Sequence, residues 1–162
     1  MHQGTSLLIV ALLVAACAGP RRPSAAVIQP AQVTLDQFQS LRWLEGTWRG
    51  SADGSEPFYE SYVYLNDSII QGFSYTDSTL AEARDSNTIA WSATGVIDSG
   101  AGLDWVATHL DSVSARFEPT RGGRNSFTWR MNSRDTWTAE LEWPDTASHV
   151  AFRTYRMDRL GN

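Results

Sequence analysis

Several residue types that build common functional sites are scarce or absent in this chain. Its 162 residues include a single cysteine and no lysine, so all 13 basic residues are arginines. One cysteine excludes an internal disulfide and the cysteine clusters that hold zinc or iron–sulfur centres. The formal net charge of -5 argues against a nucleic-acid-binding protein, which needs a basic stripe.

The motifs of the common enzyme classes are missing as well. The chain contains no GxSxG elbow, no P-loop and no HExxH pair. Six of the 18 acidic residues fall in expected turns, where short carboxylates cap backbone amides, or on a strand face with a solvated pattern. They are Asp67, Asp77, Asp98 and Asp111 in the turns, and Glu140 and Glu142 on the strand. We therefore expect a protein that is not an enzyme and has no metal site.

The N-terminus carries the one long apolar run. Leu7–Ala16 has the length of a signal-peptide core and is too short to span a membrane. It ends in Val-Ala-Ala before Cys17, which resembles the lipobox of bacterial lipoproteins. The resemblance implies cleavage before Cys17, a diacylglycerol on its thiol and an acylated amino terminus. The alternative is an ordinary secretory signal with an incidental cysteine.

These features divide the chain into three parts. Residues 1–16 are the expected signal peptide, and residues 17–35, rich in proline and small residues, are a flexible tether behind the lipidated cysteine. Residues 36–162 form the expected folded domain. Several acyl chains hold a protein on a membrane without spanning it. We expect a monomer anchored by lipid in the bacterial cell envelope, facing the periplasm or the exterior.

The folded domain is predicted to be all-β. After one or two helical turns over 36–44, short segments of alternating polarity follow one another between turns. Thr136–Trp143 is the clearest, with apolar residues on one face and polar residues on the other. The expected strands are 47–52, 58–65, 68–76, 88–98, 103–110, 112–118, 126–132, 136–143 and 149–160. Closing such a meander removes its exposed edges, so we predict an antiparallel up-and-down β-barrel of about 8–10 strands.

The stretch LRWLEGTWRG, residues 41–50, organises this barrel. Gly46 allows a sharp turn into the first strand, and Trp48 fills one barrel end. A Gly-x-Trp after a short helical turn resembles the lipocalin-like, or calycin, barrels. That resemblance implies that an arginine of the closing strand packs over the tryptophan, and Arg153 and Arg156 are the candidates.

The longer string GTWRG resembles the first strand of nitrobindin-type barrels, which bind haem. The stretch LRWLEGTWRG followed by the strand FYESYVYL is also similar to bacterial domains of unknown function related to that group. The resemblance implies a haem ligand on a late strand, where His149 is the candidate. The alternative for His149 is an exposed residue at the entry to the last strand.

The seven tryptophans and other aromatic residues suit an interior that either holds a ligand or is filled by side chains. The leading hypothesis is a cavity that binds a small hydrophobic or amphipathic molecule. The cavity candidates are Trp91, Trp105, His109, Trp129, Trp137 and Tyr75, with Gln71 and Tyr59 as further inward polar residues. The alternatives are a haem-binding barrel using His149 or His109, and a filled barrel that docks envelope partners through Trp43, Tyr62 and Tyr64.

Overall fold

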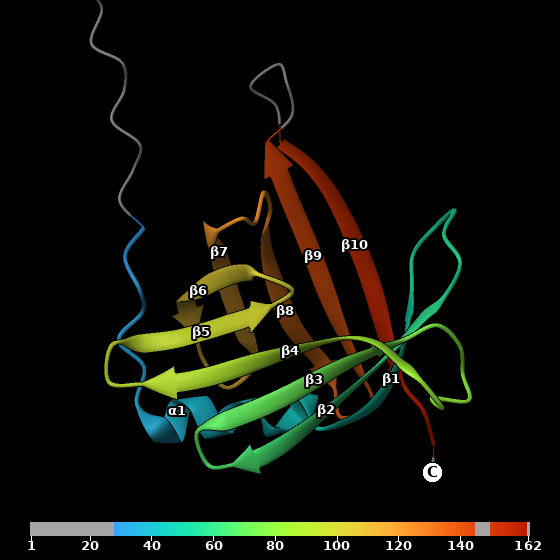
Figure 1. Ribbon diagram of the computed structural model, residues 1–162, viewed down its shortest axis with the longest axis horizontal. Coiled ribbons are helices and arrows are strands. Elements are labelled where there is room, and N and C mark those ends of the chain that lie inside the picture. The colour runs from blue at the N-terminus through green and yellow to red at the C-terminus, as the bar shows by residue number, and fades with distance from the viewer. Residues whose placement is uncertain (1–27, 145–149, 162) are drawn as a thin grey trace, which may run out of the picture.

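The computed structural model describes residues 28–144 and 150–161. Over these ranges the chain forms a closed antiparallel barrel in which each strand pairs with the next and β1 pairs with β10 (Figure 1). The predicted all-β barrel is confirmed, with ten strands in the described ranges. The elements are α1 (Leu35–Gln39), η1 (Ser40–Leu44), β1 (Gly46–Ser51), β2 (Phe58–Asn66), β3 (Ile69–Tyr75), β4 (Ala83–Ser92), β5 (Gly95–Gly100), β6 (Leu103–Leu110), β7 (Ser114–Arg121), β8 (Ser126–Ser133), β9 (Thr136–Pro144) and β10 (Val150–Arg159).

One predicted strand was wrong. The segment 88–98 is two strands, because a tight turn joins Ser92 of β4 to Gly95 of β5. Gly95 has a φ of +133°, which favours glycine. The extra turn changes which residues face inward, so Asp98 lies on the inner face and Ile97, expected inside, is 42% exposed.

A short helical segment closes one end of the barrel. Thr34 caps α1: its Oγ1 accepts from the Gln37 backbone N–H, and the Gln37 side chain accepts from the Thr34 N–H. Phe38, Leu41 and Leu44 are fully buried, as their spacing predicted. Figure 1 shows α1 beneath the end of the barrel where β4 ends and β3 begins. No helix of the described residues is long and apolar enough to cross a membrane.

Trp48 anchors this closed end. Its indole is 1% exposed, and its Nε1 donates to the Leu44 carbonyl at 2.7 Å. The Arg159 guanidinium lies 4.0 Å from the centre of the indole ring. Arg159 also donates to the carbonyl oxygens of Trp43 and Glu45, at 3.2 and 2.8 Å. One cation therefore ties the last strand to the helical segment and to the tryptophan.

The arginine that packs over the tryptophan is Arg159 and not Arg153 or Arg156. Arg159 is the direct cross-strand partner of Trp48, so the two side chains share a face. Arg156 pairs with the far end of β1, and Arg153 pairs with β9. Gly46, with a φ of +129°, is required here because a Cβ at this position would overlap the Arg159 guanidinium.

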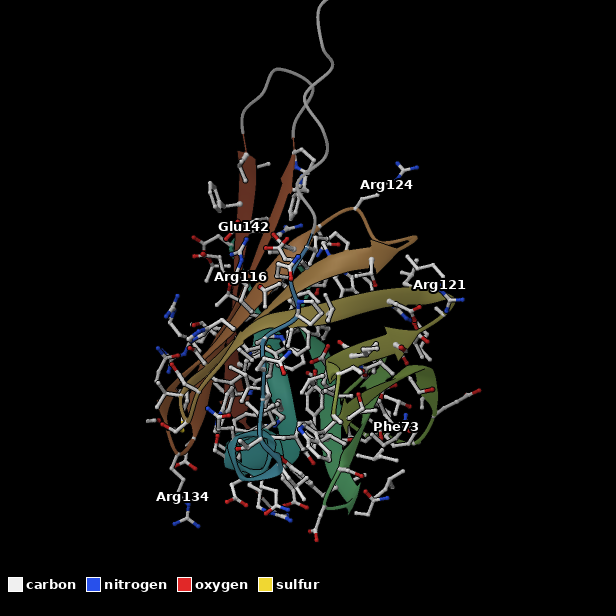
Figure 2. The ribbon with its side chains drawn as sticks, turned by 90° about the vertical axis from the view of Figure 1, so that its left-hand side faces the viewer. Phe73, Arg116, Arg121, Arg124, Arg134 and Glu142 are labelled. Atoms are coloured by element: carbon white, nitrogen blue, oxygen red, sulfur yellow. The ribbon has the colours of Figure 1, made fainter. Side chains whose placement is uncertain are left out.

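The outer face of the barrel carries paired charges. Arg116 of β7 and Glu142 of β9 point toward each other in Figure 2. Their two hydrogen bonds measure 2.7 and 3.0 Å, and Arg116 Nε donates to Glu118 Oε1 at 2.8 Å. Glu142, expected on a solvated face, is thus partly buried under a bidentate arginine, which lowers the pKa of its carboxyl.

Candidate functional site

A cavity of about 480 Å³ occupies the barrel interior beyond the buried closed end. Eight of the strands contribute inner-face residues to it, while α1 and η1 contribute none. Its size suits a small organic molecule. The lining consists of Phe58, Glu60, Tyr62, Ser74, Asp85, Ser86, Asn87, Asp98, Gly100, Ala101, Leu103, Trp105, Asn125, Phe127, Trp129, Trp137, Ala139, Leu141, Tyr155 and Met157.

Aromatic rings form much of the wall. The Tyr62 ring centre lies 6.1 Å from that of Trp129 and 6.3 Å from that of Trp137, in edge-to-face arrangements. Trp105 lies nearer the rim, and its Nε1 donates to the Asn125 carbonyl at 2.8 Å. Trp137 is 1% exposed, yet its Nε1 has no acceptor among the described residues. An N–H donor is therefore left unsatisfied in the wall.

Two carboxylic acids project into this aromatic interior. Tyr62 Oη donates to Glu60 Oε2 at 2.8 Å, within one inner face of β2. On the adjacent strands β4 and β5, Asn87 Nδ2 donates to Asp98 Oδ1 at 2.6 Å, and Asp98 is 5% exposed. Gly72 makes room for the group, because a Cβ there would overlap the Asn87 side chain and touch the Tyr62 ring.

The surroundings of both acids disfavour their charged forms. Burial raises the pKa of Glu60 to about 7; the Tyr62 hydrogen bond opposes this shift and the charge of Asp98 adds to it. Burial also raises the pKa of Asp98 to about 6, against the hydrogen bond from Asn87. Burial and the neighbouring Glu60 carboxylate raise the pKa of Tyr62 well above its ordinary value. Burial therefore brings the pKa values of both carboxyls close to neutral pH.

No lysine, arginine or histidine is among the described residues that line the cavity. Three acids are: Glu60, Asp98 and the more exposed Asp85. The arginines closest along the chain to the rim residue Asn125 are Arg121 and Arg124, and Figure 2 shows both projecting outward from the barrel. The cavity thus combines apolar walls with a negative or neutral polar patch, depending on pH.

Three of the predicted cavity residues line the cavity. Trp105, Trp129 and Trp137 do so because the alternation in β6, β8 and β9 places them inward. Two others do not. Trp91 packs beside the chain before α1, where its Nε1 donates to the Val33 carbonyl at 2.7 Å. Tyr75 hydrogen-bonds to Ser61 at 3.0 Å on the other face of β3.

The inner face of β3 is the one opposite to that predicted. Gly72 is buried beside Asn87 and Ser74 lines the cavity, so Gln71 and Tyr75 face outward. Tyr59 likewise alternates with the inward Phe58 and Glu60 and does not line the cavity. The pattern failed here because both faces of these strands carry aromatic and polar residues.

His109 lies outside the cavity. The pairing of β6 with β7 shifts between Ala107 and His109, which breaks the alternation on which its inward placement depended. Its side chain is 57% exposed, and its Nε2 lies 3.0 Å from Asp111 Oδ2. His109 therefore cannot ligate a haem bound in the barrel.

The remaining haem candidate, His149, lies outside the described residues, as do Cys17 and the predicted signal peptide. Within 28–144 and 150–161 no histidine borders the cavity, and no group of three or more histidine, cysteine or acidic residues is placed to hold a metal ion. The haem alternative therefore depends on His149, whose position the described residues do not give.

The sequence prediction missed Glu60, Asn87 and Asp98. Cross-strand pairing would have located Glu60, because its partner Trp48 was already assigned to the interior and paired residues share a face. Tyr62, predicted on an outer docking surface, is inward for the same reason and is 7% exposed. Asp98 could be assigned to the interior only once the turn between β4 and β5 was known.

Comparison with known proteins adds little to these observations. No protein-family model matches the chain, and no curated protein matches it. Among solved structures, the M. tuberculosis protein Rv2717c is 11% identical with a TM-score of 0.44, over 77% of this chain and 98% of that one. EF1p2_mFAP2b bound to DFHBI is 10% identical with a TM-score of 0.41, over 76% and 99% of the two chains. A redesigned β-barrel is 8% identical with a TM-score of 0.37, over 76% and 96%. These values are too low to carry an inference about function.

Proposed function

We propose that this protein is a lipid-anchored carrier of the bacterial cell envelope whose barrel binds one small amphipathic molecule. The observation that supports it most directly is the cavity of about 480 Å³, with aromatic walls and a few polar groups gathered in one region. An apolar wall with few polar groups is the usual chemistry of a small-molecule site. We further propose binding without catalysis, so the ligand is recovered unchanged.

The filled-barrel alternative is less well supported. It needs an interior occupied by side chains and an outer aromatic surface. The cavity opposes the first requirement, and the inward position of Tyr62 removes part of the second.

Ligand binding is tested on the soluble chain from Ala18 onward. The hydrophobic core runs from Val33 to Met157, so this chain keeps all of it. Native mass spectrometry of detergent-free protein is expected to show a bound mass that is lost on denaturation. Titration with the neutral apolar dye N-phenyl-1-naphthylamine is expected to give a saturable rise in fluorescence at a 1:1 ratio.

A matched pair of variants tells cavity binding from surface adsorption. Ser74→Trp places a large ring into the cavity, while Phe73→Trp adds an indole on the outer face of the same strand. Ser74→Trp is expected to abolish dye binding and Phe73→Trp to retain it, with both folded by circular dichroism. Equal dye binding by the two folded variants, or a clean unliganded mass and no dye signal, would overturn the proposal.

The anchor has a separate test. In cells, the full chain is expected to take up a palmitate analogue and to sediment with membranes, and Cys17→Ala is expected to lose both properties. Unchanged labelling of Cys17→Ala would contradict the proposed lipidation.

A further inference from the structure

We propose that the molecule bound in the cavity is an organic cation: a protonated amine on an apolar or aromatic body, with the amine held by Glu60 and Asp98. This inference rests on the proposed function, since it names the chemical class of the ligand for that cavity.

The charge balance of the cavity differs from that of the outer surface. On the outside, Arg116 pairs with Glu142 and Arg121 pairs with Asp104, each at 2.7 Å. Inside, Glu60 and Asp98 have no basic partner among the described residues. Buried carboxylates without a counter-charge are costly. This cost is relieved either by protonation of the acids or by a cationic ligand.

The hydrogen bonds leave acceptors open to a ligand. One oxygen of each carboxyl is engaged within the protein, Glu60 Oε2 by Tyr62 and Asp98 Oδ1 by Asn87. Glu60 Oε1 and Asp98 Oδ2 have no donor among the described residues, whereas an ammonium group supplies up to three. The two internal bonds also fix both carboxyls in place, so the ligand meets a prepared site.

The walls fit the rest of such a ligand. The rings of Tyr62, Trp129 and Trp137 meet edge to face beside the acids, and ring faces attract cations.

A divalent metal fits less well than an amine. Calcium takes about six to eight oxygen ligands and magnesium about six. No described cluster of three or more acidic, histidine or cysteine residues is placed for a metal ion. The aromatic walls would also have no role around a hydrated ion.

Proton exchange follows from the same arrangement. The titratable groups that face Glu60 and Asp98 across the cavity are Tyr62, Tyr155 and, at greater exposure, Asp85. A cation binds the deprotonated carboxylates more tightly than the neutral acids. Because the pKa values of Glu60 and Asp98 lie near 7 and 6, affinity for a cation falls as pH falls from about 8 to about 5.

The test uses three probes with one ring system and different charges: tryptamine, neutral tryptophol and anionic indole-3-acetate. Each competes with N-phenyl-1-naphthylamine and is titrated by calorimetry on the chain from Ala18. At about pH 8, tryptamine is expected to bind at least about tenfold more tightly than tryptophol, and indole-3-acetate more weakly than both. N,N,N-trimethyltryptammonium, whose charge does not depend on pH, is expected to show the same loss of affinity toward about pH 5.

Glu60→Gln and Asp98→Asn are each expected to remove most of the preference for tryptamine while retaining the dye. Glu140→Gln, on the opposite face of β9 from the cavity-lining Ala139 and Leu141, is the matched control and is expected to keep the preference. Using two independent acids keeps the test decisive if one variant does not fold.

The outcomes separate this inference from the function beneath it. If the dye binds but tryptophol or indole-3-acetate binds as tightly as tryptamine or more tightly, the proposal of a cationic ligand is wrong and the proposed carrier function still stands. Displacement of the dye by calcium chloride at equal ionic strength would contradict the proposal of an amine ligand and favour a metal ion. Failure of the dye and all the indoles to bind would overturn both proposals.

Discussion

The two ends of the barrel treat charge in opposite ways. At the closed end, the Arg159 cation rests on the Trp48 ring and donates to two neighbouring carbonyl groups. In the cavity, Glu60 and Asp98 are surrounded by largely apolar walls, and none of the described lining residues is basic. The closed end has the arrangement that stabilises a fold, whereas the cavity retains groups that destabilise it. Such local violations of folding rules are typical of functional sites.

The largest difference between the ends is expected from tryptophan truncation. Trp48→Ala removes a side chain that is 1% exposed and leaves a cavity under the helical segment, so it should cost about 3–5 kcal/mol of unfolding free energy. Trp105→Ala, at the partly exposed rim of the open cavity, should cost about 1–2 kcal/mol and weaken dye binding. Urea unfolding measures both. Equal losses would mean that the two ends contribute alike to stability.

The second test removes a buried acid. Glu60→Gln should stabilise the unliganded protein by about 1–3 kcal/mol at about pH 8 and hardly at all at about pH 4. The reason is that the folded-state pKa of about 7 exceeds the ordinary value of 4.5, so the folded protein holds the proton more tightly. Stability from this group is complete below that ordinary value and is lost as pH rises through about 7.

Urea unfolding at several pH values checks this sign, with Glu140→Gln as the control. If Glu60→Gln is less stable than the parent at about pH 8, where the parent carries the buried charge, then the charged carboxylate of Glu60 does not destabilise the folded protein.

The smallest expected effect separates the arginines of β10. Arg159→Ala removes the ring contact and the carbonyl bonds at the closed end, and should cost about 1–2 kcal/mol. Arg153→Ala, an exposed position, should cost less than about 0.5 kcal/mol. Thermal unfolding of the two variants compares them directly. A larger loss for Arg153→Ala would contradict the assignment of Arg159 as the partner of Trp48.

Local patterns in the sequence predicted the fold well. The alternation in β9 and β8 identified Trp137 and Trp129 as interior residues, because one face of each strand is clearly more apolar. The i, i+3, i+6 spacing of Phe38, Leu41 and Leu44 likewise identified the buried face of the helical segment. In each case the signal lies within a single element.

The candidate site was predicted less well. In β2 and β3 both faces carry aromatic or polar residues, so the pattern did not say which face turns inward, and Tyr62 and Tyr75 were placed on the wrong side. His109 was misplaced by a shift in strand pairing that leaves no mark on its own strand.

The sequence by itself therefore determined the all-β barrel, most of its strands and the Gly46–Trp48 anchor, because periodicity and backbone freedom are local properties of the chain. Only the tertiary structure decided that Glu60 and Asp98 share one cavity. Their strands are not neighbours in the sheet, and an offset of one residue in either would turn its acid to the outside. The pairing of β2 with β1 places Glu60 on the inner face, and the turn between β4 and β5 does the same for Asp98. Together they decide the chemistry of the interior.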